Sequence, residues 1–106
     1  MGVYLGTINF TAGPDGTSNW PIELFVANDG TALGDTFDPE GDGFQFQGTV
    51  NFTSGAFTLA VNGGAESLTG ITGNLTGNFV SSMLANGTFN LSNGDTGAVS
   101  FPKVAP

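Results

Sequence analysis

The side chains of this chain that could do chemistry are mainly carboxylates, and they are distributed unevenly. Five of the nine acidic residues fall between positions 29 and 42. Among them, Asp38, Glu40 and Asp42 stand at alternate positions, and a glycine follows at position 43. Calcium takes about six to eight oxygen ligands, and carboxylates at alternate positions of a loop can supply several of them. Two interpretations stay open: a calcium site at these three residues, or a solvated acidic loop that only turns the chain.

The acidic segment resembles the first half of an EF-hand loop, with Asp38, Glu40 and Asp42 at its first, third and fifth positions. It departs from that family at the twelfth position, where Thr49 replaces the glutamate that binds calcium through both oxygens. Alternating apolar residues follow the segment, which indicates a strand where an EF-hand has a helix. The resemblance therefore implies at most a simpler calcium loop.

The composition excludes most kinds of catalysis. The chain has no histidine and no cysteine, so it lacks the usual bases and nucleophiles of hydrolases and the usual nitrogen and sulfur ligands of zinc. Paired carboxylates alone can hydrolyse glycosides. Of the glutamates, Glu23 and Glu66 lie within predicted strands, but so small a domain with one tryptophan makes a poor sugar-binding cleft. We therefore expect that the protein is not an enzyme and has no cofactor beyond the calcium considered above.

The charge argues against nucleic acids and membranes as partners. One lysine stands against nine acidic residues, which gives a net charge of −8. Such a chain cannot neutralise phosphate groups, and anionic lipid surfaces repel it. No segment approaches the ~20 consecutive apolar residues of a membrane-spanning helix. We expect no nucleic-acid binding and no membrane insertion.

Two aromatic residues that carry polar atoms are candidates for a binding surface. Tyr4 and Trp20 each join an apolar ring to a hydrogen-bonding group, which suits the edge of a binding site. Trp20 begins an alternating segment and precedes Pro21, so we expect it at the rim of the fold. The alternative is that these rings only fill the core or plug the rim.

The elements that must position these residues are β-strands. Apolar residues alternate with polar ones, for example at Trp20, Ile22, Leu24 and Val26, and this period of two is typical of half-buried strands. Pairs such as Asn-Gly and Asp-Gly, which favour tight hairpin turns, separate the alternating segments. The pattern predicts nine strands, at residues 3–11, 20–28, 31–37, 44–53, 56–61, 66–72, 74–80, 87–91 and 97–103.

Short links between these strands predict an antiparallel up-and-down meander in a single domain, residues 1–106. Glycines within strands, at Gly6, Gly48, Gly70 and Gly77, weaken a flat sheet but permit the bends of a closed one. The expected fold is therefore all-β, a small closed or nearly closed barrel, with a β-sandwich as the alternative. A barrel of about eight strands can be filled by side chains or hold one small ligand. We expect it to be filled, by Phe10, Phe25, Phe46, Phe52, Phe57, Phe79 and Phe89.

Segments such as Tyr4-Leu5-Gly6-Thr7 and Leu75-Thr76-Gly77-Asn78-Phe79 are similar to the strands of small β-meander domains of bacterial secreted and surface proteins. The barrel lobes of surface lipoproteins that capture host proteins have a similar pattern of glycine, threonine and apolar residues in their strands. The resemblance implies a non-catalytic module, secreted or on the surface of a bacterium, that binds a protein, a glycan or itself through loops at one barrel end. The alternatives are a self-assembling subunit of a virion surface or an extracellular fibre, and a carrier of a small apolar ligand.

Overall fold

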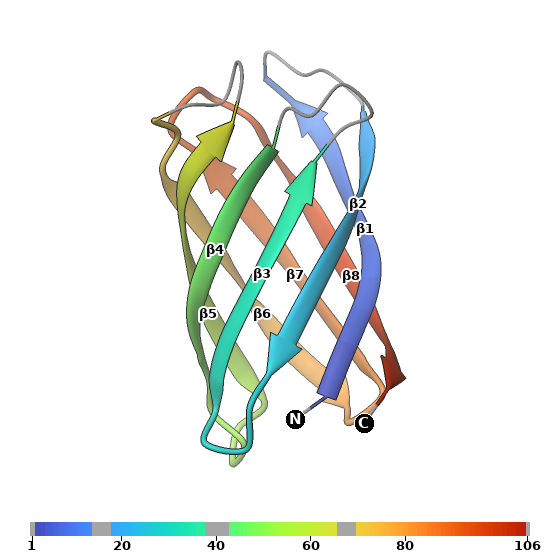
Figure 1. The fold of residues 1–106 in the computed structure, drawn as a ribbon. Helices are drawn as coiled ribbons and strands as arrows, with labels where there is room; N and C mark the ends of the chain where they lie inside the picture. The colour runs from blue at the N-terminus through green and yellow to red at the C-terminus, as the bar shows by residue number, and fades with distance from the viewer. Residues whose placement is uncertain (1, 14–17, 38–42, 66–69, 106) are drawn as a thin grey trace.

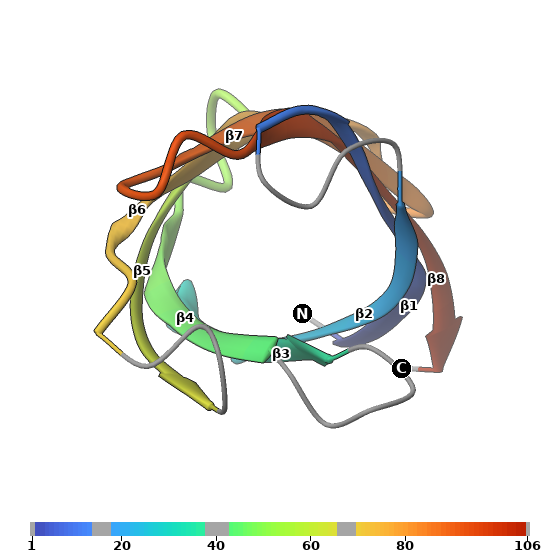
Figure 2. The same ribbon diagram turned by 90° about the horizontal axis from the view of Figure 1, so that it is seen from above.

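The computed structural model describes residues 2–13, 18–37, 43–65 and 70–105, of which residues 37, 62–65 and 105 are described by their backbone alone. Each strand pairs antiparallel with the next, and β8 pairs with β1, so the meander closes into a barrel (Figure 1, Figure 2). The closed barrel confirms the predicted all-β meander and excludes the sandwich. The described residues contain no helix long and apolar enough to cross a membrane. The strands are β1 (Gly2–Ala12), β2 (Asn19–Val26), β3 (Thr31–Phe37), β4 (Gly43–Val50), β5 (Ala56–Ala65), β6 (Gly73–Ser81), β7 (Leu84–Leu91) and β8 (Thr96–Ala105).

The prediction of a separate strand at residues 66–72 is not met in the part of it that the structure describes. Residues 66–69 lie outside the described residues, and residues 70–72 form no strand. Instead, β5 continues to Ala65 and β6 starts at Gly73. Gly70 has a φ of 83°, a left-handed conformation that turns the chain and ends extended pairing there.

The period of two in the sequence decides which side chains enter the barrel. On β2, Trp20, Ile22, Leu24 and Val26 all point inward and are at most 5% exposed, as predicted. The intervening Phe25 is 47% exposed, because a residue between two inward neighbours must face the outside of the sheet. Its assignment to the core, which rested on residue type, is wrong.

Aromatic rings pack the middle of the barrel. The ring of Phe10 lies 4.5 Å from that of Trp20 and 5.0 Å from that of Phe89, measured between centroids. Phe57 and Phe101 pack edge to face at 6.4 Å. All five side chains are buried. The interior is thus filled by side chains, as expected, although two of the expected phenylalanines are replaced in the core by Phe44 and Phe101.

Glycines make room for these rings. Gly77 and Gly87 face each other across β6 and β7, and a Cβ atom on either would stand 2.8 Å from the Cζ atom of Phe57. That separation is too short for two carbon atoms, so the Phe57 ring occupies the space that side chains would fill. Three of the four predicted mid-strand glycines lie within strands, and Gly70 does not.

The strand order gives the barrel two distinct ends. Strands β1, β3, β5 and β7 finish, and β2, β4, β6 and β8 start, at the end drawn at the top of Figure 1. The turns at residues 27–30, 51–55 and 82–83 lie at the other end, where β1 starts and β8 finishes (Figure 1). We call this second end the terminal end.

Candidate functional site

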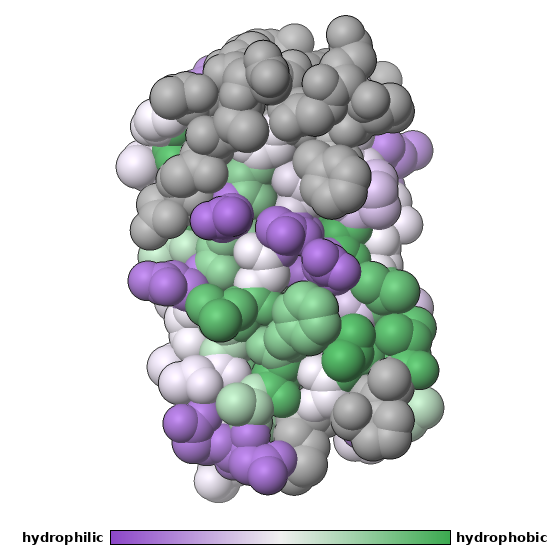
Figure 3. Space-filling model, in the orientation of Figure 1, coloured by the Kyte–Doolittle hydropathy of each residue, from purple (hydrophilic) through white to green (hydrophobic). Residues whose placement is uncertain are grey.

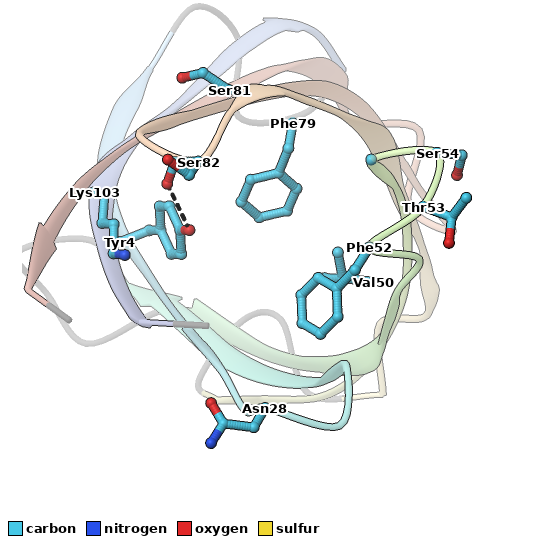
Figure 4. A pocket seen from close by; sticks show the side chains of 11 residues that line it. Tyr4, Asn28, Val50, Phe52, Thr53, Ser54, Phe79, Ser81, Ser82 and Lys103 are labelled. Atoms are coloured by element: carbon cyan, nitrogen blue, oxygen red, sulfur yellow. Dashed lines mark hydrogen bonds between the residues drawn. The ribbon is translucent and has the colours of Figure 1, made fainter.

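An open cavity of about 670 Å³ lies at the terminal end of the barrel. Its volume falls within the range of about 300–1,000 Å³ that is usual for small-ligand sites. The walls come from the ends of β1, β4, β6 and β8 and from the turns at this end (Figure 4). Strands and turns far apart in the sequence therefore build one concave surface.

Three aromatic rings surround the cavity: Tyr4 from β1, Phe79 from β6 and Phe52 from the turn between β4 and β5 (Figure 4). Tyr4 and Phe79 pack edge to face with centroids 5.2 Å apart, and Phe79 rests on the buried Phe57 at 5.9 Å. Phe52 is 53% exposed, so much of its face is open to solvent. The cavity has an apolar wall that continues into the core.

Local hydrogen bonds fix the turn that presents Phe52. The side-chain oxygen of Asn51 accepts bonds from the backbone N–H groups of Thr53, at 2.9 Å, and Ser54, at 3.1 Å. The next residue, Gly55, has a φ of 81°, and its carbonyl accepts a 2.7 Å bond from the N–H of Phe79. An asparagine that bonds to its own turn is a common way to fix such a turn. This backbone hydrogen bond therefore holds the turn that carries Phe52 against the strand that carries Phe79. Because the strand pattern ends at Val50, the expectation that Phe52 lies in the core is wrong.

Tyr4 places a hydroxyl group at the inner edge of the cavity. The side chain is 2% exposed, and its hydroxyl donates a 3.0 Å hydrogen bond to the carbonyl of Ser82 (Figure 4). Burial raises the pKa of the Tyr4 phenol, which therefore stays neutral at ordinary pH. The oxygen of this hydroxyl can still accept a hydrogen bond from a ligand.

The only basic residue of the chain, Lys103, also lines the cavity. On β8, Val99 and Phe101 point inward and are buried, and Lys103 is the next inward position. It is half-buried, and Figure 4 places it at the edge of the opening, beside Tyr4. Its backbone N–H donates a 2.7 Å bond to the carbonyl of Met83. Within the described ranges, no carboxylate forms an ion pair with it.

The structure separates the two aromatic residues singled out from the sequence. Tyr4 belongs to the cavity at the terminal end, whereas Trp20 is the second residue of β2 and lies near the opposite end. Trp20 is 5% exposed, packs on Phe10 and is not among the residues that line the cavity. The three residues of the predicted calcium site, Asp38, Glu40 and Asp42, lie outside the described residues. In the part that is described, no three acidic side chains gather as a metal site would require.

Sequence reasoning did not identify Phe52, Phe79 or Lys103 as site residues. One signal was available for Lys103, because it is the single cation of the chain and stands two residues after an inward phenylalanine. No such signal exists for the two phenylalanines. They meet Tyr4 only because the barrel closes and brings their elements to the same end.

The outer wall carries a second feature, an apolar patch formed by Val3, Leu5, Phe25 and Leu33. Phe25 pairs with Val3 on one side and Leu33 on the other, and the three larger side chains are 47–58% exposed. Figure 3 shows apolar side chains gathered over this part of the barrel, below a band of polar residues. Phe25 and Leu33 line shallow hollows of this surface, and none of the four residues lines the cavity at the terminal end.

A comparison with known protein families, curated proteins and solved structures finds no match to this chain. The cavity geometry is therefore the basis for assigning a function.

Proposed function

We propose that the protein is a non-catalytic binding module whose site is the cavity at the terminal end of the barrel. The observation that carries this proposal is the convergence of three aromatic rings, from three separate elements, on one open cavity of about 670 Å³. Its ligand is a small molecule with an apolar body, because apolar walls with a few polar groups are typical of such sites. The residues in contact with the ligand are Tyr4, Phe52 and Phe79.

This proposal combines two interpretations drawn from the sequence. A site built from turns at one barrel end agrees with the expected loop-presenting module, and an apolar ligand agrees with the expected carrier. The packed middle of the barrel argues that the ligand occupies the mouth rather than the interior. Adhesion, self-assembly, calcium binding and a secreted or surface location stay predictions from the sequence.

A neutral fluorescent probe tests the proposal. We expect N-phenyl-1-naphthylamine to bind in the cavity, with a rise in emission and saturable binding to one site. Replacing Phe52→Ala removes one exposed ring without touching the core. The dissociation constant should rise about two- to thirteenfold, since an aromatic contact contributes about 0.5–1.5 kcal/mol.

The chain offers a matched control. Phe25 is 47% exposed and lies on the outer patch, so Phe25→Ala removes the same ring from a surface away from the cavity. Binding of the probe should be unchanged in that variant. The proposal would be overturned if the probe did not bind, or if Phe25→Ala weakened binding as much as Phe52→Ala.

A further inference from the structure

We infer that the ligand of the cavity is an amphipathic anion, a carboxylate on an apolar body, and that Lys103 binds its carboxylate group. This inference rests on the proposed function and specifies the chemical class of its ligand. The observation behind it is the position of the single cation of a chain with net charge −8. That cation lines the cavity at the terminal end, whose described walls carry three aromatic rings.

The surroundings of Lys103 leave its charge available to a ligand. The side chain is half-buried beside the Tyr4 ring, and no described carboxylate pairs with it. A half-buried lysine packs its aliphatic stem against apolar neighbours and keeps its ammonium group at the surface, where a ligand can reach it. A bound carboxylate would supply an ion pair, and the described lining of the cavity includes no acidic residue that would repel it.

The same geometry favours a carboxylate over other charged ligands. A single lysine matches one negative charge, whereas phosphate groups are commonly bound by several cations or by the fork of an arginine. Aromatic rings can also attract a cationic ligand, and the net charge of the protein would draw one in. At this site, however, the ammonium group of Lys103 lies beside Tyr4 and opposes a second cation.

Three ligands with the same chain length test the inference. Decanoate, decanol and decyltrimethylammonium, which differ in the charge of the head group, are each titrated against the neutral probe at pH 7 and low salt. Decanoate is ionised under these conditions. We expect it to bind at least about threefold more tightly than decanol, and the cation to bind most weakly.

Variants of Lys103 show whether this residue causes the preference for decanoate over decanol. Lys103→Met should reduce the affinity for decanoate to that for decanol and leave decanol binding in place, while Lys103→Arg should retain the preference for decanoate. Asn90→Asp is the matched control, because it gives the same net charge as Lys103→Met at an exposed position near the opposite end of the barrel. Thermal unfolding of each variant confirms that the barrel is intact.

The outcomes for the two proposals are distinct. If the neutral probe and decanol bind but decanoate binds no more tightly than decanol, the anionic class is wrong and the apolar site stands. The same conclusion follows if Lys103→Met weakens the binding of decanoate and decanol equally, or if Asn90→Asp weakens decanoate binding as much as Lys103→Met does. It also follows if decyltrimethylammonium binds most tightly of the three. If neither the probe nor decanol binds, the proposed function itself is wrong.

Discussion

Two carboxyl groups on the outer wall, Glu23 and Asp35, contribute to the pH dependence of stability. Glu23 and Asp35 stand directly opposite each other on β2 and β3. The hydrogen bond between their side chains raises the pKa of Glu23, and desolvation and the charge of Asp35 raise it further. Because the pKa of Glu23 is higher in the folded protein than in the unfolded chain, the stabilisation is present at low pH. It is lost as the pH rises through the pKa of the folded state.

Replacing Glu23→Gln should therefore stabilise the protein at pH 7. The amide can donate a hydrogen bond to Asp35 at every pH, and the repulsion between like charges directly opposite each other, about 0.2–1 kcal/mol, is removed. The midpoint of thermal unfolding should rise by about 1–5 °C at pH 7. The difference from the natural protein should shrink towards pH 4, where Glu23 is protonated. A midpoint that falls at pH 7 would contradict this account of the pair.

The pKa of Asp29 is shifted in the opposite direction to that of Glu23. The backbone N–H and the hydroxyl of Thr31 both donate hydrogen bonds to the Asp29 carboxylate, at 2.9 and 2.7 Å, and these bonds lower the pKa of Asp29. Its contribution to stability is therefore present at neutral pH and lost as the pH falls through the lowered pKa. Asp29→Asn should lower the unfolding midpoint at pH 7, where Glu23→Gln raises it.

At the scale of the strand, the alternation of the sequence explains most of the fold. The series from Trp20 to Val26 correctly predicts which face of β2 is buried. The same alternation places Phe25 outside, which hydrophobicity alone does not indicate. Strand ends are harder to predict, because Phe52 continues the apolar pattern by type but follows the last paired residue of β4. Periodicity is thus informative only as long as the strand continues.

The close packing of Phe57 against Gly77 and Gly87 leaves no room for a side chain at either glycine. A methyl group at Gly87 would meet the Phe57 ring at 2.8 Å and would also collide with the carbonyl of Thr76. We expect Gly87→Ala to lower the free energy of unfolding by about 1–3 kcal/mol, measured by denaturant titration. In a Phe57→Leu background the same substitution should cost less, because part of the clash is removed. Equal costs in both backgrounds would show that the ring does not fill this space.

At the scale of the whole molecule, closure creates both the fold and the candidate site. Turn signals and alternation predict most of the hairpins, since paired strands are neighbours in the sequence, but they fail between β5 and β6, where they predict an extra strand. The pairing of β1 with β8 joins opposite ends of the chain, and no local pattern specifies it. The meeting of Tyr4, Phe52 and Phe79 depends on that closure. This is why the sequence predicted the barrel and the polar aromatic Tyr4 but not the cavity around it.

Closure of the barrel also predicts that the protein tolerates circular permutation of its chain. Val3 pairs with Ala105, so the two ends of the chain lie side by side at the terminal end. A circular permutant that joins residue 106 to residue 1 through a short glycine and serine linker, and opens between residues 15 and 16, keeps all eight strand pairings. It should keep the oligomeric state of the natural protein and unfold in one cooperative transition close to that of the natural protein.

The contrasting variant removes β8 by ending the chain at Asp95. This deletion leaves β1 and β7 with unpaired edges and takes the buried Val99 and Phe101 out of the core. Exposed edges with apolar inner faces promote association between chains. We therefore expect aggregation in light scattering and no cooperative transition. A truncated chain that stayed monomeric and unfolded cooperatively would show that an open sheet is stable, and that closure between β1 and β8 does not hold this fold together.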